Sequence, residues 1–330
     1  MQYKRVVVTQ RGGPENMEVM DYELHPPSPG EARIKILAAP VCSPDVTSRY
    51  GQSPFVPKPP YVPGYAFIGV IDALGEDVTC WQVGQQVAGL TAYDSYSETI
   101  YWDAKKLIPF DYDVDLGEAV TILLNYIVAY HAMHWQAKVK EGDKVLIIGA
   151  SGGIGTALLQ LGKLAGLKMY GLASAEKHYI LEKYGAYPID YRTQDFVEVL
   201  KELEPQGIDV VFDGMAGEYF KRSFSVLGRG GVLVGYGNPL SVGGMFGVLG
   251  QVALYTLLPN GRKAKYYSTG LSNLRWEKFL QDWDFLFKLI EQGKLKPVIQ
   301  ARFPILEARQ ANELLESGKV VGNVVLLAPE

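Results

Sequence analysis

A glycine-rich turn between a strand pattern and a helix pattern constrains the fold of this chain more than any other feature. Four β-prone apolar residues, Val145–Ile148, lead into Ala150-Ser-Gly-Gly-Ile-Gly155, where Ala150 replaces the usual first glycine, and a helical pattern follows over 156–165. This order is typical of a dinucleotide pyrophosphate site, because small residues let the backbone approach the phosphates and the helix N-terminus offers unpaired N–H groups. The predicted cofactor-binding residues of the turn are Gly152, Gly153, Ile154 and Gly155.

Alternating strand and helix patterns continue after the turn. The predicted strands cover 168–173, 186–190, 208–212 and 231–235, and the predicted helices cover 175–184, 195–204 and 218–227. Strands that are apolar on both faces suit a parallel sheet covered by helices. Roughly five βα repeats of this kind predict an α/β fold with a doubly wound parallel sheet of the Rossmann type.

The N-terminal part has a different character. Short strand patterns cover 5–9, 32–38, 66–74 and 86–90, and many prolines lie within the first 64 residues. This density predicts turns and irregular β structure and no helices. The C-terminal part shows helix patterns over 278–292 and 308–317 and a final strand over 323–327. We therefore expect a β-rich domain that is interrupted by the nucleotide-binding domain and completed by the C-terminal part.

Composition narrows the function classes. The 330 residues, 48% of them hydrophobic, can form two domains with separate cores. The formal net charge of −4, without a basic tract, argues against nucleic-acid binding. Two cysteines, Cys42 and Cys80, favour a reducing compartment over a disulfide framework. Because the first ten residues hold no signal-peptide core, we expect a cytoplasmic protein.

The stretch 238–260 has no charged residue and approaches the length of a membrane span. It contains Pro239 and several glycines and directly follows a strand pattern. We therefore expect a buried loop and helix that line an apolar pocket over the cleft, with no stable membrane insertion; insertion is the alternative. The side chains that would form an apolar acceptor site or, equally, a second core or dimer contact are Met245, Phe246, Leu249, Tyr255, Leu257 and Leu258.

Several segments resemble the medium-chain dehydrogenase/reductase superfamily in order and spacing over nearly the whole chain. They are Val41-Cys-Ser-Pro-Asp45, Val62-Pro-Gly-Tyr-Ala-Phe-Ile-Gly69, Val83-Gly-Gln-Gln-Val-Ala-Gly89, Asn125-Tyr-Ile-Val-Ala-Tyr130, the glycine turn and Asp213-Gly-Met-Ala-Gly217. Within the superfamily the chain is similar to the zinc-independent quinone oxidoreductases. It most resembles their vesicle amine-transport-homologue branch, through Asn125-Tyr-Ile127, Ala173-Ser-Ala-Glu-Lys-His178 and Ile189-Asp-Tyr191.

The resemblance implies a GroES-like catalytic domain, a Rossmann domain, a cleft between them and a homodimer. We expect the catalytic domain over residues 1–122, the Rossmann NADPH-binding domain over 123–262, and the return of the chain to the catalytic domain over 263–330.

The zinc-binding relatives hold their catalytic metal with an early Cys, a His-Glu pair after Pro-Gly, and a later Cys. Cys42 stands at the first position, but Tyr65 and Ala66 replace the His-Glu pair, and the only other cysteine is Cys80. One thiolate cannot supply the three protein ligands that a catalytic zinc needs. The four-Cys structural zinc loop is also missing.

A pair of histidines, His131 and His134, also suggests a metal. Both fall on a helix pattern with no further ligand nearby in the sequence, which favours a structural role. We therefore expect no metal in this protein.

The position that selects between NADPH and NADH falls about 20 residues after the glycines, where NAD-specific sites carry an acidic residue. The chain has the small, neutral Ser174 there, followed by Lys177, and Tyr191 follows the third strand pattern together with Arg192. In the relatives that the chain resembles, the matching Lys and Tyr contact the 2′-phosphate. These residues favour NADPH, although Glu176 would reverse the preference if its side chain pointed into the site.

Further cofactor contacts are expected at strand ends, where ligands bind in doubly wound sheets. Met215 follows the fourth strand pattern, and Gly237 and Asn238 follow the fifth. The resemblance places the backbone at Asn238 beside the nicotinamide and a cofactor-binding polar side chain at Asn323. All of them could equally be turn residues.

No Ser/His/Asp or Cys/His arrangement is evident from spacing, which suits hydride transfer by a nicotinamide, because the protein then mainly positions the acceptor and stabilises the developing oxyanion. The candidate catalytic residues are Tyr65, as a hydrogen-bond donor or simple packing, and Asn125, as an oxyanion donor or nicotinamide neighbour. The remaining cleft candidates are Cys42, Asp45, Thr47, Tyr50 and Tyr126.

The leading hypothesis is a zinc-independent, NADPH-dependent reductase that transfers hydride to a small-molecule acceptor, a quinone or an α,β-unsaturated carbonyl compound (enone). An enoyl-thioester reductase is the enzymatic alternative; it would need a basic rim for a carrier phosphate, for which Arg262, Lys263 and Lys265 are the only candidates. A nucleotide-binding regulatory or membrane-associated protein with weak catalysis is the alternative of another class.

Overall fold

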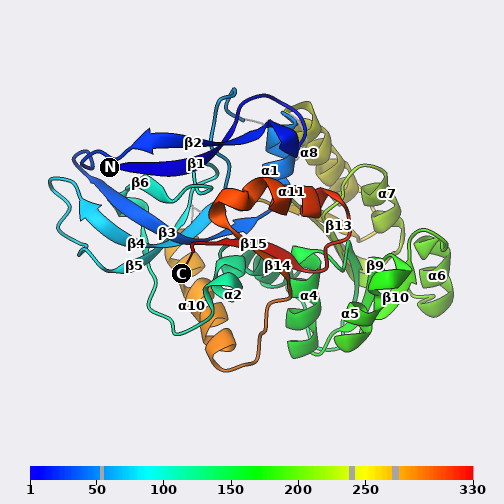
Figure 1. Cartoon of the computed structure of the whole chain (residues 1–330). Helices are drawn as coiled ribbons and strands as arrows, with labels where there is room; N and C mark the ends of the chain where they lie inside the picture. Colours follow the sequence, from blue (N-terminus) through cyan, green and yellow to red (C-terminus); the bar gives the residue numbers. More distant parts are fainter. Residues whose placement is uncertain (53–55, 238–241, 270–274, 330) are drawn as a thin grey trace. The chain divides into compact units, whose positions relative to one another are not determined.

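The computed structural model describes residues 1–52, 56–237, 242–269 and 275–329. The chain divides into two compact units (Figure 1): the first consists of Met1–Leu124 and Phe287–Glu330, and the second is the continuous segment Asn125–Leu286. The first boundary lies close to the one expected after residue 122. The second boundary lies beyond the one expected after residue 262, because the residues that follow this point form another strand of the second unit's sheet.

A six-stranded parallel sheet forms the centre of the second unit, with the order β10-β9-β8-β11-β12-β13. Its strands are β8 (Lys144–Ile148), β9 (Lys168–Ala173), β10 (Tyr187–Asp190), β11 (Ile208–Asp213), β12 (Leu227–Tyr236) and β13 (Lys263–Tyr267). Leu146, Val211 and Leu233 of the inner strands are fully buried, as expected for a sheet that is covered on both faces. From β8 the chain adds β9 and β10 on one side of the sheet and then β11, β12 and β13 on the other side. This change of side confirms the doubly wound Rossmann arrangement.

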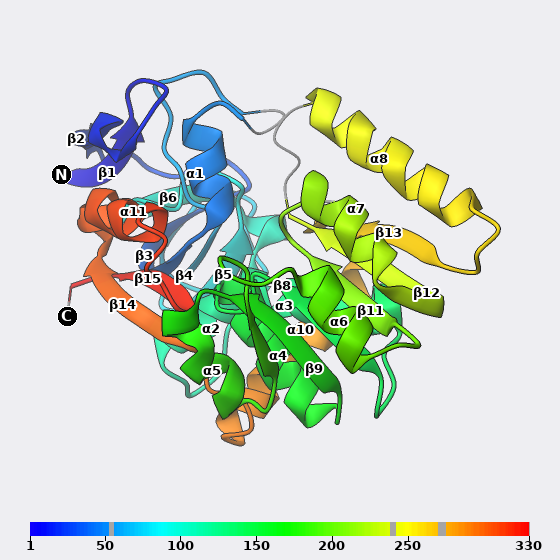
Figure 2. The same ribbon diagram turned by 90° about the vertical axis from the view of Figure 1, so that its right-hand side faces the viewer.

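Helices connect the successive strands of this sheet (Figure 2). They are α4 (Gly153–Leu164), α5 (His178–Lys183), α6 (Phe196–Leu203), α7 (Glu218–Ser225) and α8 (Val242–Leu257). The start of α6 shows why these segments fold as they do. The Asp195 side chain accepts a hydrogen bond from the backbone N–H of Val197 (2.8 Å), while Phe196 and Leu200 enter the core beside the sheet.

A seven-stranded sheet and a two-stranded hairpin form the first unit. The sheet has the order β14-β15-β3-β4-β5-β7, with β6 also paired to β3, and β1 and β2 form the hairpin. The strands are β1 (Gln2–Val8), β2 (Met17–Glu23), β3 (Glu31–Val41), β4 (Ala66–Leu74), β5 (Gln86–Leu90), β6 (Thr99–Asp103), β7 (Ile108–Pro109), β14 (Ile299–Pro304) and β15 (Asn323–Leu327).

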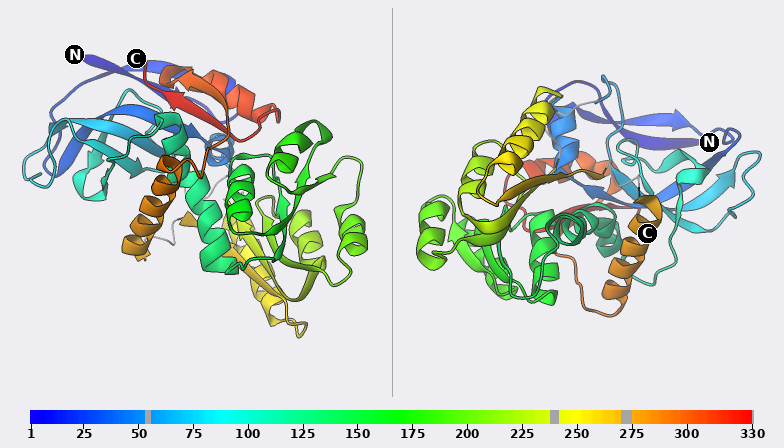
Figure 3. Two further views of the ribbon diagram at one scale, coloured as in Figure 1. Left: turned by 90° about the horizontal axis from the view of Figure 1, so that it is seen from below. Right: turned by 180° about the vertical axis from the view of Figure 1, so that it is seen from behind.

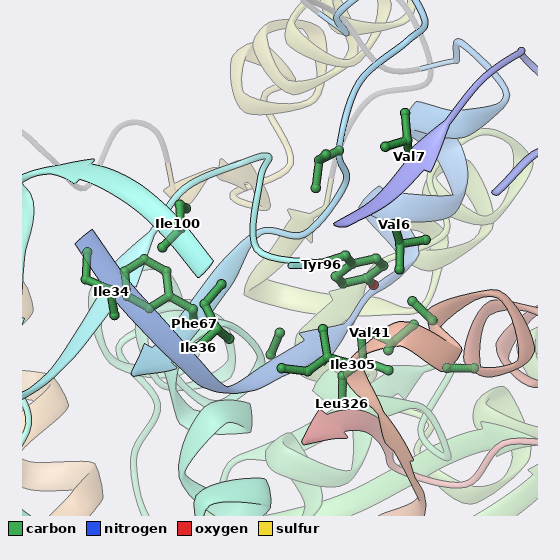
Figure 4. Close-up of a cluster of buried hydrophobic side chains, with 14 of the residues drawn as sticks. Val6, Val7, Ile34, Ile36, Val41, Phe67, Tyr96, Ile100, Ile305 and Leu326 are labelled. Carbon is green, nitrogen blue, oxygen red and sulfur yellow. The ribbon is translucent and has the colours of Figure 1, made fainter. Parts of the chain in front are cut away.

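Both ends of the chain contribute to the core of the first unit. Ile34 and Phe67 from the N-terminal strands share one buried cluster with Ile305 and Leu326 from the C-terminal part (Figure 4). β15 pairs antiparallel with β3, and β14 runs parallel to β15 (Figure 3). Helix α11 (Ala308–Glu316) contributes buried alanines to the same cluster. The predicted return of the C-terminal part to the β-rich domain agrees with this arrangement.

A helical segment precedes β8. It consists of α2 (Leu116–Thr121), a π-helical turn (Ile122–Tyr126), α3 (Ile127–His131) and a second π-helical turn (Ala132–Ala137). The stretch Leu116–Ala137 is long and apolar enough to cross a membrane by length and composition. An 18-residue window of it has a mean hydropathy of 1.2, but 78% of that window is buried inside the protein. A second long helix, α10 (Trp276–Glu291), closely matches the helix expected over 278–292.

The expectation that the proline-rich N-terminal part holds no helix is wrong. Ser43–Arg49 form α1, whose first turn contains Pro44. Proline is tolerated there because the N–H groups of the first turn have no intrahelical partner. Asp45 completes the helix start, since its carboxylate accepts the backbone N–H of Cys42 (2.9 Å).

Candidate cofactor site and active site

The glycine turn leaves β8 at Gly149, which adopts a positive φ of 72°, and enters α4 at Gly153. A Cβ atom on Gly155 would lie 2.3 Å from the carbonyl oxygen of Gly149, so only glycine lets the helix pack this closely against the turn. At Gly152 the nearest atom to a Cβ would be the same oxygen, at 3.5 Å, so the space outside this backbone is open. The structure therefore brings Gly152, Gly153, Ile154 and Gly155 together at one helix start.

This helix start has the chemistry that a pyrophosphate requires. The first turn of α4 contains no acidic residue. Its leading N–H groups have no intrahelical acceptor, and the helix dipole adds positive potential at this end. Gly152, Gly153 and Ile154 are only partly buried, so their backbone is accessible.

The second group of predicted cofactor residues meets at the adjoining strand ends. Asp190 of β10 pairs with Ala173 of β9, so Ser174 and Tyr191 leave neighbouring strands at the same edge. Ser174 is buried, whereas Tyr191 is exposed and its ring centroid lies 5.8 Å from the guanidinium carbon of Arg192. Lys177 follows in the turn that leads into α5, and its partial burial lowers its pKa.

The turns after β9 and β10 form a corner of the second unit, which contains Ser174, Lys177, Tyr191 and Arg192. Glu176 also lies in this corner, where an acidic side chain would affect the choice between NADPH and NADH. Arg192 Nη1 lies 3.0 Å and 3.2 Å from the two carboxylate oxygens of Glu176. Its own backbone N–H, the Ser174 hydroxyl and Arg192 lower the pKa of this carboxyl. The Glu176 carboxylate thus lies among hydrogen-bond donors and cations, and Asp190 is a second carboxylate at the same edge, which accepts the backbone N–H of Arg192.

Met215 and Gly237 lie at the ends of two neighbouring strands, because Asp213 of β11 pairs with Gly235 of β12. The Asp213 carboxylate shapes the first turn by accepting the N–H groups of Met215 (2.8 Å) and Ala216 (3.1 Å). Met215 is exposed.

Gly237 adopts a positive φ of 103°, and its carbonyl accepts a hydrogen bond from the Tyr266 hydroxyl. The sequence indicates Asp213 only as part of a segment that resembles the family, and it gives no sign of Tyr266, because both residues act on the backbone at these two strand ends. The predicted contact Asn238 lies outside the described residues.

In the first unit, a fully buried carboxylate organises the segments around Cys42. Asp45 accepts the N–H of Cys42 (2.9 Å) and the hydroxyl of Tyr96 (2.9 Å) on one oxygen, and the N–H of Gly64 (3.1 Å) on the other. Burial raises the pKa of Asp45 to about 6, although these hydrogen bonds act to lower it. Burial and the neighbouring Asp45 raise the pKa of the Cys42 thiol well above its usual value, which disfavours a reactive thiolate.

Tyr65 follows the Gly64 turn and is partly exposed. Its ring centroid lies 6.1 Å from that of Tyr93, and the two side chains share a hydrogen bond. Tyr93 in turn packs edge-on against Tyr61, with 5.7 Å between centroids. Tyr65 is therefore one end of a row of three tyrosines, which sequence reasoning missed because Tyr93 is 28 residues further along the chain than Tyr65.

Asn125 lies in the first π-helical turn and is partly buried, while its neighbour Tyr126 is fully buried and accepts a hydrogen bond from Gln160 Nε2 (2.9 Å). π-Helical turns are frequent at functional sites. Asn323 begins β15 in the first unit, and its amide nitrogen donates to the carbonyl of Val298 (2.9 Å). This bond gives Asn323 a structural role, and its predicted contact with a cofactor remains a prediction.

Comparisons with known proteins agree with the two-unit fold. Residues 28–109 match the family model described as "Alcohol dehydrogenase GroES-like domain", and residues 184–326 match "Zinc-binding dehydrogenase". A 2-haloacrylate reductase from Burkholderia sp is 30% identical over 97% of this chain and 98% of its own length. The chain belongs to the medium-chain dehydrogenase/reductase superfamily. Its relatives place it with the quinone oxidoreductase type and support an oxidoreductase.

Other members of the superfamily give the same picture. A synaptic vesicle membrane protein VAT-1 homolog from Danio rerio is 28% identical over 98% of this chain and 70% of its own length. The Escherichia coli quinone oxidoreductase complexed with NADPH has a TM-score of 0.86 at 26% identity, covering 98% of this chain and 99% of that one. JamJ enoyl reductase in its apo form also has a TM-score of 0.86, at 26% identity, with 100% of both chains covered.

Zinc appears in the description of one matching family, so the metal positions in this medium-chain dehydrogenase/reductase matter. Within residues 1–52, 56–237, 242–269 and 275–329, no three His, Cys, Asp or Glu side chains are grouped so that they could hold a metal ion. Asp45 directs both carboxylate oxygens at backbone and hydroxyl donors. Zinc independence remains a prediction.

The expected structural role of His131 agrees with its surroundings. The ring lies between Tyr267 (Nδ1 to hydroxyl, 2.7 Å) and Asp282 (Nε2 to Oδ2, 3.1 Å) and stacks on Trp135. Burial lowers the pKa of His131 to about 4, so the ring is neutral at physiological pH.

The expectation of a buried apolar loop after β12 is wrong for the part of the chain that the structure describes. Residues 242–257 form α8, and Phe246, Leu249 and Leu257 are exposed. Tyr255 is partly buried and packs against the core beside the sheet, stacked on Phe224 at 4.3 Å between centroids. The side chain of Met245 lies outside the described residues. A sequence window cannot distinguish these cases, because an exposed and a buried apolar helix have the same composition.

Proposed function

We propose that this chain is a zinc-independent, NADPH-dependent reductase that transfers hydride to quinones or α,β-unsaturated carbonyl compounds. The observation that carries the proposal is the corner beside the glycine turn. There the position after β9 holds the hydroxyl of Ser174 and no carboxylate, with Lys177 and Arg192 as neighbouring cations. A 2′-phosphate needs such donors, whereas an NAD-specific site has an acid at this strand end. The NADPH in the similar quinone oxidoreductase supports the same cofactor.

Different residues of the chain would then bind different parts of the cofactor. The glycine turn would bind the pyrophosphate. The 2′-phosphate end would be bound by Ser174, Lys177 and Tyr191, and the nicotinamide end by the turns at Met215 and Gly237. The bound nicotinamide supplies the hydride. Tyr65 and Asn125 are the candidate donors of a hydrogen bond to the oxygen of the acceptor as negative charge develops on it, and water can supply the proton.

The test follows the absorbance of NADPH, and separately of NADH, with a panel of quinones and enones. We expect faster oxidation of NADPH, with a quinone or enone as acceptor, and no loss of rate after treatment with a chelator. A clear preference for NADH would contradict the cofactor assignment. Loss of activity on chelation, restored by zinc, would contradict zinc independence.

An enoyl-thioester reductase is the second candidate, and the likeness to JamJ enoyl reductase favours it. The predicted basic rim argues against it. Arg262 Nη1 donates to the carbonyls of Phe224 (3.3 Å) and Ser225 (3.5 Å) at the end of α7, and Lys265 Nζ donates to the carbonyl of Gln136 (2.6 Å). Two of its three cations therefore already bind carbonyls within the chain. Faster turnover of a crotonyl thioester than of crotonaldehyde would support this candidate.

We also propose that the protein is a cytoplasmic homodimer without stable membrane insertion. β13 ends the six-stranded sheet, and α8 beside it exposes apolar side chains, so both offer a surface to a second copy. Light scattering after size exclusion tests the dimer, and a monomeric mass would contradict it. The exposed face of α8 and the VAT-1 relatives favour a membrane-associated protein as the alternative. Flotation with liposomes would support that alternative.

A further inference from the structure

Glu176 and Arg192 form an ion pair at the corner where the adenosine end of the cofactor is expected. The pair joins the turn after β9 to the turn after β10, across 16 residues of sequence. Both side chains are more than half exposed, at 56% and 57%. An exposed pair of this kind contributes little to the stability of the fold. Stability alone therefore does not account for a carboxylate at this place.

The surroundings of the Glu176 carboxylate form an anion-binding set. In order of their effect on its pKa, they are the backbone N–H of Glu176, the hydroxyl of Ser174 and the guanidinium of Arg192, and all of them lower that pKa. Ser174 is fixed in position, because it is only 2% exposed. The backbone of Arg192 is held in place because its N–H donates to Asp190 Oδ1 (3.1 Å). A hydroxyl, a backbone amide and a guanidinium are also the donors that bind a phosphate monoester.

We propose that the Glu176 carboxylate is an internal substitute for the 2′-phosphate of NADPH, which competes with that phosphate for Ser174 and Arg192. The inference rests on the proposed function. A phosphate dianion would displace the carboxylate, because the ion pair is weak in water and the exposed side chain can rotate into solvent. Glu176 then reduces the difference in affinity between NADPH and NADH. The hydrogen-bond donors must pass from the carboxylate to the phosphate, and the negative charge of Glu176 remains close to that phosphate.

Two other roles for Glu176 predict different results. A carboxylate that accepts the ribose 2′-hydroxyl would favour the cofactor without the phosphate. A simple surface ion pair would influence neither cofactor. The substitution Glu176→Gln separates these roles, because it removes the charge while keeping the shape of a side chain in the exposed turn that leads into α5. Glu182→Gln is the matched control: Glu182 is an exposed glutamate in α5, and its substitution changes the net charge equally.

The experiment measures binding by calorimetry to the full-length wild type, to E176Q and to E182Q. The probes are adenosine 2′,5′-bisphosphate, which carries the 2′-phosphate, and adenosine 5′-monophosphate, which does not. We expect E176Q to bind the bisphosphate about three- to tenfold more tightly than the wild type, and the monophosphate within about twofold. E182Q should match the wild type with both probes. NADPH and NADH should follow the bisphosphate and the monophosphate, respectively.

Unchanged binding of the bisphosphate by E176Q, or the same gain in E182Q, would overturn the inference. Weaker binding of the monophosphate and NADH by E176Q would instead assign Glu176 to the ribose hydroxyl and also overturn it. If the wild type oxidises NADPH while E176Q shows unchanged affinities, only this inference fails. If the folded wild type binds neither NADPH nor the bisphosphate, the proposed function fails together with the inference. A second variant, E176A, should repeat the gain seen in E176Q.

Discussion

The Tyr96 hydroxyl donates a hydrogen bond to Asp45 over 2.9 Å, although the two residues are 51 positions apart in the sequence. Both side chains are almost completely buried, and the same Asp45 oxygen also accepts the N–H of Cys42. A buried carboxylate is tolerated only where several donors surround it. The pair therefore fixes the start of α1 against the segment that contains Tyr96, and it holds the cysteine at its observed place.

Replacing Tyr96 by Phe should destabilise the protein by about 1–3 kcal/mol, because one donor to a buried carboxylate is lost. Chemical unfolding of wild type and Y96F at neutral pH measures this effect. An equal stability of the two proteins would show that water replaces the Tyr96 hydroxyl.

Asp45 should give the stability a distinctive dependence on pH. Burial raises its pKa to about 6 in the folded protein, above the unfolded value near 3.8. Its contribution is therefore fully present below about pH 4 and is lost as the pH rises through 6, by about 3 kcal/mol in total. The unfolding free energy of the wild type minus that of D45N should fall by this amount between pH 4 and pH 7. A difference that does not vary with pH would contradict the raised pKa.

His131 should give the stability of the protein the opposite dependence on pH. Its pKa is lowered to about 4 by burial, so its contribution to stability is present above the unfolded pKa of about 6.5 and is lost as the pH falls from there through 4. Over this pH range the free energy of unfolding of the wild type should fall by about 3 kcal/mol relative to that of H131Q. Thermal unfolding of both proteins between pH 4 and pH 7 measures the loss, and parallel curves would argue against it.

Two glycines of the turn should respond differently to alanine. In G155A the new Cβ would meet the Gly149 oxygen at 2.3 Å, so we expect a lower melting temperature together with loss of cofactor binding. In G152A the Cβ has room, and φ is −80°, so the fold should persist while the methyl group obstructs the approach of the phosphates. We expect at least about a tenfold weaker binding of NADPH by G152A at an unchanged melting temperature. Equal melting temperatures for both variants would contradict this distinction.

Tyr65 should matter for turnover if its hydroxyl reaches the acceptor. We expect Y65F to lower kcat for a quinone about tenfold or more while the affinity for NADPH stays unchanged. Y187F is the control, because Tyr187 is an exposed tyrosine at the start of β10. Equal rates for wild type and Y65F would assign Tyr65 to packing in the row of tyrosines.

The sequence was most informative where local pattern and burial agree. The bounds of β4, β5, β9 and β15 match the predicted strands, because each is a short apolar run between turn residues. β13 escaped prediction because its charged sequence, Lys263–Tyr267, lacks an apolar pattern, and this shifted the expected domain boundary. The glycine turn and the corner at Ser174 could be recognised because their residues are close together in the chain.

The rest of the candidate site depends on contacts between distant residues. The sequence indicates Asp45 as a cleft residue, but its partners at Gly64 and Tyr96 are known only from the folded chain. The sequence indicates that Glu176 could reverse the cofactor preference, yet only the structure shows its pairing with Arg192. Tyr65 lies beside Tyr93 for the same reason: a turn brings together rings that no local pattern connects.

The pairing of β15 with β3 affects how the protein is made. During synthesis, residues 125–286 leave the ribosome as one uninterrupted stretch and can complete their own sheet, because every strand of that sheet is already present. β3 can pair early with β4 and β6, but its residues 38–41 lack their partners in β15 until residues 323–327 emerge. A stalled or prematurely terminated chain would thus present a finished nucleotide-binding unit and an open, apolar strand edge, which is the form that chaperones and proteases recognise.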